Sequence, residues 1–265
     1  MTRGSGSSQQ AVVVALANQK GGVGKSTTAI NLTAAMALQG LRCLLVDLDP
    51  QGNATSGMGI DRSTLALSIY DVLLKEIPLE DAIEPSSVKN LFVVPATIDL
   101  AGAEIELVPA FSREGRLRAA LAEVVESFDV VIIDCPPSLG LLTVNALTAA
   151  SEVLIPIQCE YYALEGLSQL LSNVDRIKRN LNPDLKVEGV ILTMYDARTN
   201  LSKDVAAQVR THFGDQTYRT VIPRSVRISE APSYGEPIEA FDPMTRGAIA
   251  YRELGREFRR RHGLD

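Results

Sequence analysis

The feature that most constrains the fold of this chain is a glycine-rich loop at residues 20–26, with the sequence K-G-G-V-G-K-S. It directly follows an apolar run at 11–17 and directly precedes a helical stretch at 25–38, which ends before Gly40. A strand, a glycine-rich loop and a helix in this order are typical of a phosphate-binding loop. Glycines let backbone N–H groups approach the phosphates, and the helix N-terminus adds a positive dipole end. The sequence therefore predicts an α/β fold with a phosphate site after its first strand.

Further apolar runs predict the rest of the fold. They are continuous rather than alternating, so we expect strands that are buried on both faces, as in a parallel sheet. The expected strands are 42–47, 91–95, 130–134, 153–158, 187–193 and 220–223, and the expected helices are 114–127, 164–180, 202–213 and 248–261. Strands that alternate with helices form right-handed βαβ units. We therefore predict a disordered tail at 1–10 and, over 11–265, a single doubly wound α/β domain whose mostly parallel sheet is flanked by helices. Residues 52–90 show the weakest pattern.

The residue types in the loop indicate what each would bind. Lys25 should reach the β and γ phosphates, Ser26 should offer its hydroxyl to Mg²⁺, and Thr27 is placed to contact the α phosphate. The residues expected to bind the nucleotide are Gly21, Gly22, Val23, Gly24, Lys25, Ser26 and Thr27, together with Met194 and Pro223. The chain is thus expected to bind ATP and Mg²⁺ and to hydrolyse the ATP.

Two carboxylate motifs complete the predicted catalytic site. Asp134 ends the apolar segment V-V-I-I-D-C-P-P-S, in the arrangement of a Walker B strand that holds Mg²⁺ through water. No glutamate follows it, because Cys135 and Pro136 come next. The replacement is expected in V-D-L-D-P-Q-G-N, where strand alternation puts Asp47 and Asp49 on the same side. One of the two would help to hold the hydrated metal while the other orients the attacking water.

The loop departs from the standard pattern, which has glycine where this chain has Gln19, and it carries an additional lysine, Lys20. In this respect it resembles the deviant Walker A loop of the group formed by ParA, MinD and the nitrogenase iron protein. The resemblance implies that Lys20 crosses a dimer interface to the partner's ATP. It also implies that Asp47 is the metal-side residue and Asp49 the water-positioning residue, because both match the family's switch segment.

Longer segments resemble the chromosomal ParA/Soj family from about Val12 onward. They are A-L-A-N-Q-K-G-G-V-G-K-S-T-T, V-D-L-D-P-Q-G-N-A-T-S-G, E-Y-Y-A-L-E-G, T-M-Y-D-A-R-T-N and V-I-P-R-S-V-R-I-S-E-A-P-S-Y-G. Membership would imply an ATP-driven switch for chromosome or plasmid partitioning. An ATP-bound sandwich homodimer binds double-stranded DNA without sequence preference, and a ParB-type partner stimulates hydrolysis. A cytoplasmic, nucleoid-associated location follows from the same resemblance.

The resemblance assigns DNA contact to Arg198 and Arg227. Candidate neighbours are Lys203, Arg210, Arg219, Arg224, Arg246 and Arg252. The total net charge is −6, but from Asp196 onward 12 lysines and arginines face 10 aspartates and glutamates, a local net of +2. A mildly basic C-terminal third on an acidic body favours an anionic partner.

Three rival functions share this loop. A MinD-like switch would need an amphipathic membrane helix at its end, whereas the segment 252–265 has few apolar residues, namely Leu254, Phe258 and Leu264. We therefore expect no membrane partner. An iron protein would need cluster cysteines, but Cys43, Cys135 and Cys159 lie in apolar runs and are interpreted as buried core residues. A small-molecule synthetase or kinase would need a substrate pocket that a sequence does not reveal.

Overall fold

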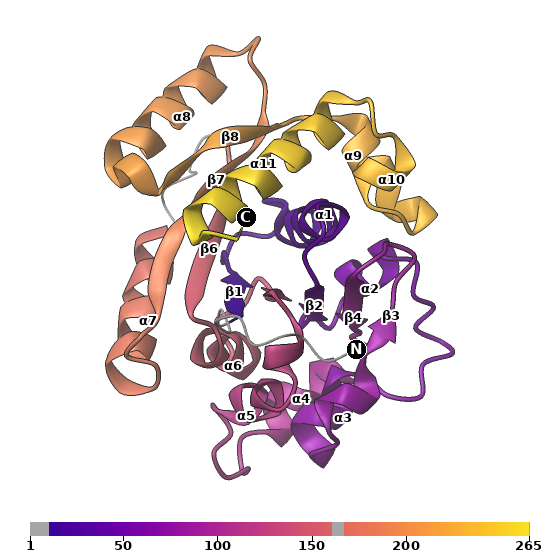
Figure 1. The fold of residues 1–265 in the computed structure, drawn as a ribbon. Coiled ribbons are helices and arrows are strands. Elements are labelled where there is room, and N and C mark those ends of the chain that lie inside the picture. Colours follow the sequence, from indigo (N-terminus) through magenta and orange to yellow (C-terminus); the bar gives the residue numbers. More distant parts are fainter. Residues whose placement is uncertain (1–10, 161–166, 265) are drawn as a thin grey trace.

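The computed structural model describes residues 11–160 and 167–264, and its centre is an eight-stranded sheet (Figure 1). The strand order is β3-β4-β2-β5-β1-β6-β7-β8, with all neighbours parallel except the antiparallel pair β3–β4. The strands are β1 (Val12–Leu16), β2 (Cys43–Asp47), β3 (Glu84–Pro85), β4 (Leu91–Val94), β5 (Val130–Asp134), β6 (Glu152–Gln158), β7 (Lys186–Tyr195) and β8 (Thr217–Pro223). The predicted fold class, a doubly wound and mostly parallel α/β sheet, is confirmed.

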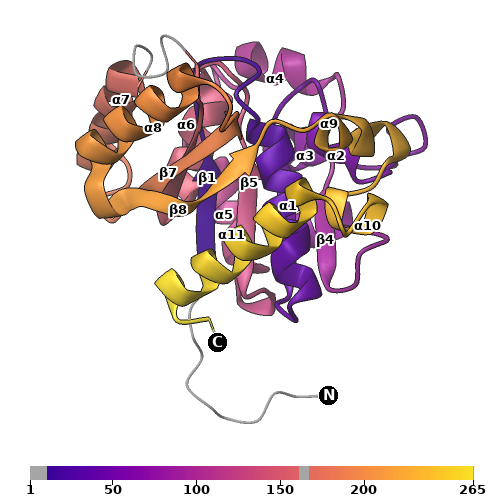
Figure 2. The same ribbon diagram turned by 90° about the horizontal axis from the view of Figure 1, so that it is seen from above.

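Helices cover both faces of this sheet (Figures 1 and 2). They are α1 (Lys25–Leu38), α2 (Asn53–Gly57), α3 (Ile69–Lys75), α4 (Leu100–Glu106), α5 (Arg116–Ala122), α6 (Leu141–Ala149), α7 (Leu167–Asn180), α8 (Asn200–Phe213), α9 (Val226–Glu230), α10 (Ile238–Phe241) and α11 (Arg246–His262). Helices α1, α2 and α9–α11 pack on one face, and α3–α8 pack on the other. Alternate residues of β1 serve the two cores: Val13 and Ala15 face the second set of helices, and Val14 and Leu16 face the first. Burial on both faces explains why the strands are continuous apolar runs.

Some predicted elements differ from the structure. The helix expected at 114–127 is the shorter α5, followed by a 3-10 helix at Val125–Ser127, because Val124 leaves helical geometry with φ −121°. Strand β8 begins at Thr217 rather than at residue 220. Helix α6 was not predicted, since it has apolar residues around its whole circumference and no side-chain N-cap. The predicted tail, the segment 161–166 of the E-Y-Y-A-L-E-G motif and the start of the helix at 164–180 lie outside the described residues.

The weakly patterned segment 52–90 contains α2, α3 and β3. Helix α3 begins with a capping box, in which Ser68 accepts from the helix backbone and Asp71 accepts from the Ser68 amide. This serine–aspartate spacing is a helix-start pattern that the sequence contained.

The topology places one edge of the sheet as the site for a ligand. Strand β1 lies between β5 and β6 in the sheet. After β1 the chain continues to β2, on the β5 side of β1, and after β5 it crosses to β6, on the other side. Ligands of doubly wound folds bind at the carboxyl ends of the strands next to such a reversal.

The three cysteines are buried, as expected. Within residues 11–160 and 167–264, no helix is long and apolar enough to cross a membrane.

Candidate functional site

The glycine-rich loop forms a tight turn between β1 and α1. Gly22 and Gly24 have φ values of 73° and 86°, a left-handed geometry that residues with a Cβ rarely adopt. Between them Val23 is buried, and its carbonyl accepts a hydrogen bond of 2.8 Å from the Thr193 hydroxyl. Thr193 lies in β7, 170 residues along the chain, so the end of a distant strand positions the loop. The loop is therefore held open at the N-terminus of α1, where its amides face a cavity.

Two adjoining cavities lie at this edge of the sheet. The larger has a volume of 570 Å³, and six of its lining residues come from the loop and the first turn of α1: Gly21, Gly22, Gly24, Lys25, Ser26 and Thr27. The smaller, of 320 Å³, also touches Gly24 and Thr27 and extends along the end of β8 past Ile222 and Pro223. Met194 lines both cavities. The arrangement suits a ligand with an anionic chain in the first cavity and a flat, less polar group in the second.

Lys25 is the main positive charge of the larger cavity. It is only 6% exposed, and its Nζ donates to the Lys20 carbonyl over 3.4 Å. Burial lowers the pKa of Lys25, while the carboxyl groups of Asp134 and Asp49 act in the opposite direction. A partly dehydrated ammonium gains more from an anionic ligand than a solvated one does, so this position is suited to bind phosphate.

Asp47 and Asp134 are register partners on the adjacent strands β2 and β5, and both are fully buried. Asp47 is well satisfied, because it accepts from the Asp49 amide at 3.1 Å and from the amide and hydroxyl of Thr55 at 2.7 Å each. Both oxygens of Asp134, by contrast, have no hydrogen-bond partner among the described residues. A buried carboxylate without donors is costly unless a cation or a proton accompanies it.

The pKa values of the pair show the same imbalance. Burial raises the pKa of Asp47 to about 6, although the hydrogen bonds from Thr55 act against the rise. Burial, together with the neighbouring Asp47, raises the pKa of Asp134 well above its usual range, while Ser26 and Lys25 oppose that rise. A divalent cation beside Asp134 would remove the repulsion between the two carboxylates. Oxygen ligands from Asp134 and Ser26, completed by water and phosphate oxygens, match the preferences of Mg²⁺, so the residues fit this ion.

The other predicted catalytic residues occupy different positions. Asp49 lines the larger cavity, is nearly buried, and accepts from the Gln51 amide at 2.9 Å. It is the one carboxylate among the described residues that line this cavity. Lys20 is exposed and does not line the cavity, although its carbonyl contacts Lys25. The structure therefore brings Lys25 and Asp49 together and leaves Lys20 on the surface.

The predicted DNA-contacting arginines lie in the segments that follow two neighbouring strands, at the same edge of the sheet. Arg198 follows β7, and Arg227 lies in α9 after β8. The ends of the two strands are joined by a hydrogen bond of 3.0 Å from the Arg224 amide to the Tyr195 carbonyl. Arg198 is 89% exposed and forms a two-pronged ion pair with Asp196. Arg227 pairs with two carboxylates, those of Glu230 and Asp242. Of the candidate neighbours, Arg210 and Arg219 line a separate cavity at the opposite end of β8, which corrects their grouping with Arg198 and Arg227.

Sequence reasoning did not single out several residues that build the site. Thr55 satisfies Asp47 and also accepts from the Ala96 amide through its hydroxyl at 2.9 Å. Asn31 connects α1 to α10, since its amide group donates to the Thr27 carbonyl and its oxygen accepts from the Ile238 amide. Thr55 and Thr193 both lie within the motif segments quoted above. Val23 is 170 residues from Thr193, so spacing does not indicate that contact. Asp47 is in the same segment as Thr55, but no local pattern shows that the Thr55 amide and hydroxyl both bind it.

Comparisons with known proteins agree with this geometry. The family model described as AAA domain matches residues 11–187. The sporulation initiation inhibitor protein Soj of Bacillus subtilis is 58% identical over 245 residues, which cover 92% of this chain and 97% of that protein. The chromosome partitioning protein ParA of Myxococcus xanthus is 53% identical over 249 residues, 94% of this chain and 88% of that protein.

Solved structures show the same fold. A Mycobacterium smegmatis protein described as cobyrinic acid a,c-diamide synthase, with bound ADP and magnesium, superposes with a TM-score of 0.82 at 43% identity, over 93% of each chain. The cell division ATPase MinD of Pyrococcus furiosus superposes with a TM-score of 0.76 at 25% identity, over 94% of this chain and 98% of that one. With its phosphate loop, paired aspartates and extensive identity to Soj and ParA, the chain belongs to the ParA/Soj family of chromosome-partitioning ATPases.

Proposed function

We propose that this chain is an ATP-driven partitioning switch. It binds ATP and Mg²⁺ in the larger cavity and forms a sandwich homodimer. The dimer binds double-stranded DNA without sequence preference, and a ParB-type protein stimulates hydrolysis and release. A cytoplasmic protein with this cycle associates with the nucleoid while ATP is bound. The named relatives support the partitioning role, and the cavity geometry supports the nucleotide chemistry.

The observation that carries the proposal is a pair of buried charges at the larger cavity: the ammonium of Lys25, which lines it, and the carboxylate of Asp134, which lies next to Lys25 and Ser26 behind the lining. The buried ammonium of Lys25 faces the cavity, and the buried carboxylate of Asp134, without donors among the described residues, ends the central strand beside the loop. A Mg²⁺–triphosphate satisfies both at once, because its phosphate oxygens pair with the lysine and its cation with the carboxylate. An uncharged ligand would leave both groups unpaired.

Each proposed role follows from position. Loop amides and Lys25 hold the β and γ phosphates, Thr27 lies beside the α phosphate, and the base occupies the smaller cavity beside Met194 and Pro223. Ser26 and Asp134 hold the metal, Asp134 through water, and Asp47 supports it from the next strand. Bound Mg²⁺ supplies positive charge opposite the β and γ phosphates.

Asp49 is proposed to orient the attacking water. It is the carboxylate that lines the cavity, and its hydrogen bond from the Gln51 amide fixes its direction. Phosphoryl transfer requires positioning of the water more than its complete deprotonation, so a hydrogen-bonded carboxylate is sufficient. Lys20 is proposed to act on the partner's nucleotide, because it is exposed beside a cavity that its own side chain does not line.

The membrane-associated MinD-like alternative is disfavoured by α11. Such a helix must offer an apolar face to lipid. Here Leu254 and Phe258 are fully buried and Leu264 nearly so, all within the core beneath α1 and the sheet. Co-sedimentation with anionic liposomes in the presence of ATP should therefore leave the protein in the supernatant.

The decisive experiment is gel filtration and DNA binding with ATP, with ADP and without nucleotide. The wild type should form a DNA-binding dimer with ATP alone. Asp49→Ala should also dimerise and bind DNA but should hydrolyse ATP at least about a hundredfold more slowly, because its water is not oriented. Lys25→Ala should show no response to nucleotide.

The proposal fails if the wild type binds DNA equally well without ATP. It also fails if turnover is raised by a small metabolite and not by DNA with a ParB-type partner, since that would indicate a synthetase or kinase. Near-normal turnover of Asp49→Ala would remove the water-positioning role from Asp49 and leave the rest of the cycle in place.

A further inference from the structure

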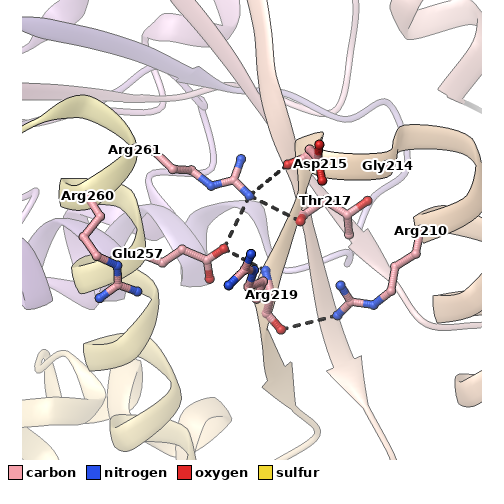
Figure 3. Close-up of a pocket in the computed structure, with 8 residues that line it drawn as sticks. All are labelled: Arg210, Gly214, Asp215, Thr217, Arg219, Glu257, Arg260 and Arg261. Carbon is pink, nitrogen blue, oxygen red and sulfur yellow. Dashed lines mark hydrogen bonds and ion pairs between the residues drawn. The ribbon is translucent and has the colours of Figure 1, made fainter.

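A second, strongly basic cavity lies far from the nucleotide site. Its volume is 690 Å³, and α8, β8 and α11 meet around it (Figure 3). Four arginines and two carboxylates line it, in a protein whose total net charge is −6. It opens at the amino end of β8, near Thr217, whereas the nucleotide cavities lie at the carboxyl end, near Pro223. A strand of this length separates the two by about 20 Å.

One of the two carboxylates that line the cavity, Glu257, forms hydrogen bonds that hold two elements of the fold together. Glu257 accepts from the backbone amides of Arg219 at 2.7 Å and Thr220 at 2.9 Å, so it fastens α11 to β8. It also accepts from Arg261 at 3.4 Å. Burial opposes the charge of Glu257, but these hydrogen bonds outweigh it and lower its pKa. The hydrogen-bond partners of Glu257 among the described residues are therefore the amides of Arg219 and Thr220 and the side chain of Arg261, and not the guanidinium groups of Arg210 or Arg260.

Arg261 is also committed to the fold. Its guanidinium donates to the carbonyls of Asp215 and Thr217 (Figure 3). It also stacks 3.9 Å from the centre of the Tyr218 ring. It supplies positive charge to the wall of the cavity, but its Nη2 is shared among three acceptors and its Nη1 lies 3.7 Å from a carboxylate oxygen of Glu188. Removal of Arg261 would therefore disturb the fold and makes it a poor probe of ligand binding.

The other three arginines of the cavity have N–H donors that are free to bind a ligand or are held only by long hydrogen bonds. Within residues 11–160 and 167–264, the guanidinium groups of Arg219 and Arg260 are exposed and make no hydrogen bond or ion pair. Arg210 makes two long hydrogen bonds, of 3.4 and 3.3 Å, to the carbonyls of Tyr218 and Arg219. The Thr217 hydroxyl also lines the cavity, is buried, and has no partner in the same part of the chain. Nearby on α11, Arg252 and Arg256 are both paired with glutamates.

We propose that this cavity is a second anion site, which binds phosphate groups of a ligand other than the ATP in the nucleotide site. Guanidinium forks and a hydroxyl match the several oxygens of a phosphate, and converging positive charge favours a polyanion over a single carboxylate. The volume accommodates more than one phosphate group. The phosphates belong either to a free compound that carries a polyphosphate chain or to the backbone of DNA. Asp215, at the rim, weakens the attraction without abolishing it.

The test uses the full chain with its nucleotide site saturated by Mg²⁺ and ADP, and sodium tripolyphosphate as the probe in isothermal titration. Arg219→Gln/Arg260→Gln should weaken tripolyphosphate binding by about tenfold, since each exposed ion pair is worth up to about fivefold in affinity. The matched control Arg176→Gln/Arg256→Gln removes the same charge from exposed positions outside the cavity and should change it by less than about twofold. Asp215→Asn should tighten binding.

A second arm identifies the source of the phosphates. A duplex is titrated with the ATP-bound protein across a salt series. If the DNA backbone enters the cavity, the Arg219/Arg260 double variant should flatten the log–log slope by about 0.9 for each lost phosphate contact, relative to the control pair. If the slopes of both double variants agree while tripolyphosphate binding is lost, the ligand is a free phosphate compound.

The proposal is overturned if tripolyphosphate binds the Arg219/Arg260 variant and the control equally, or if the wild type does not bind it. Thermal melts of the variants should match the wild type, because Arg219 and Arg260 are exposed and unpaired and the ion pair that the control removes, Arg256–Glu253, is exposed and contributes little to stability. The tripolyphosphate arm needs neither ATP hydrolysis nor a dimer. A failure of the partitioning cycle would therefore leave this result interpretable by itself.

Discussion

The two lysines of the glycine-rich loop differ sharply in their surroundings, although they are only five residues apart. Lys25 is buried at the start of α1 and faces the larger cavity, whereas Lys20 is exposed at the outer side of the loop. The ammonium of Lys25 is thus placed to bind a ligand in the cavity of its own subunit, whereas the ammonium of Lys20 is accessible to a second molecule. Their roles in a nucleotide cycle should separate cleanly by substitution.

Lys20→Ala should retain ATP affinity within about threefold of the wild type, because it removes an exposed charge that does not line the cavity. It should nevertheless lose the ATP-dependent dimer and the turnover, since the proposed contact is with the partner's nucleotide. Light scattering with ATP, beside a fluorescent-nucleotide titration, measures both. Lys178→Ala, on the exposed side of α7, is the control. A dimer of normal strength in Lys20→Ala would rule out the role across the interface.

The loops that follow β7 and β8 combine exposed arginines with their own acidic partners. Arg198 is held by Asp196, and the hydrogen bonds from Arg198 lower the pKa of Asp196 to about 2. Arg227 is held by Glu230 and Asp242. A DNA phosphate must therefore displace or share these carboxylates, which lowers the affinity of a single subunit. Two subunits double the number of contacts, so DNA binding should depend strongly on dimerisation.

Arg198→Ala and Arg227→Ala should each reduce the log–log salt slope of DNA binding by roughly 1 to 2 for the dimer, because each removes one phosphate contact per subunit. Dimerisation with ATP should be unchanged, since both side chains are exposed and outside the cavity formed by the phosphate loop. Fluorescence anisotropy with two unrelated duplexes measures the slope, with Arg256→Ala as the control. Wild-type slopes in both variants, or a strong preference for one duplex, would contradict the arginine assignment.

Across the whole molecule, α11 connects the end of the described chain to both halves of the sheet. It packs against α1 and β8 (Figure 2). Its last turn is joined to β6 by a hydrogen bond of 2.7 Å between His262 and Glu152. Glu152 also pairs with Lys186 at the start of β7. Burial opposes the charge on His262, but the hydrogen bonds to Glu152 and to the Phe258 carbonyl outweigh it and raise the pKa of His262 above 6.5.

The pH dependence of stability follows from these shifts. Because the pKa of His262 is raised on folding, its contribution is complete below 6.5 and is lost as the pH rises through the folded value. The pKa of Glu152 is lowered by His262 and Lys186 despite its burial, so its contribution is present above 4.5 and is lost as the pH falls. The pair should stabilise the fold most between these two values.

His262→Gln should therefore lower the free energy of unfolding by about 1 to 2 kcal/mol near pH 5.5 and by clearly less near pH 8.5. Urea unfolding of wild type and variant at both pH values measures the difference. His212→Gln, at the exposed end of α8, is the control and should show little pH-dependent change. An equal loss at both pH values would show that His262 contributes by packing on Phe258 rather than by charge.

The sequence alone determined those features that depend on neighbouring residues. The phosphate loop, the bounds of α1 and the aspartates at the ends of β2 and β5 followed from short-range spacing, because glycines, helix starts and buried strands have local patterns. Helix α6 and the short elements between 52 and 90 lacked such a pattern or were overlooked, and α5 was predicted too long.

Only the tertiary structure decided how distant segments share charge. In the fold, Thr55 donates hydrogen bonds to Asp47, whereas the carboxylate of Asp134 has no donor among the described residues. The Thr193 hydroxyl donates to the carbonyl of Val23. The fold also divided the arginines of the basic C-terminal third between two ends of β8. Sheet order and register set these distances, and the 170 residues between Val23 and Thr193 carry no information about either. The chemistry of each side chain is therefore visible in the sequence, while its partners are set by the fold.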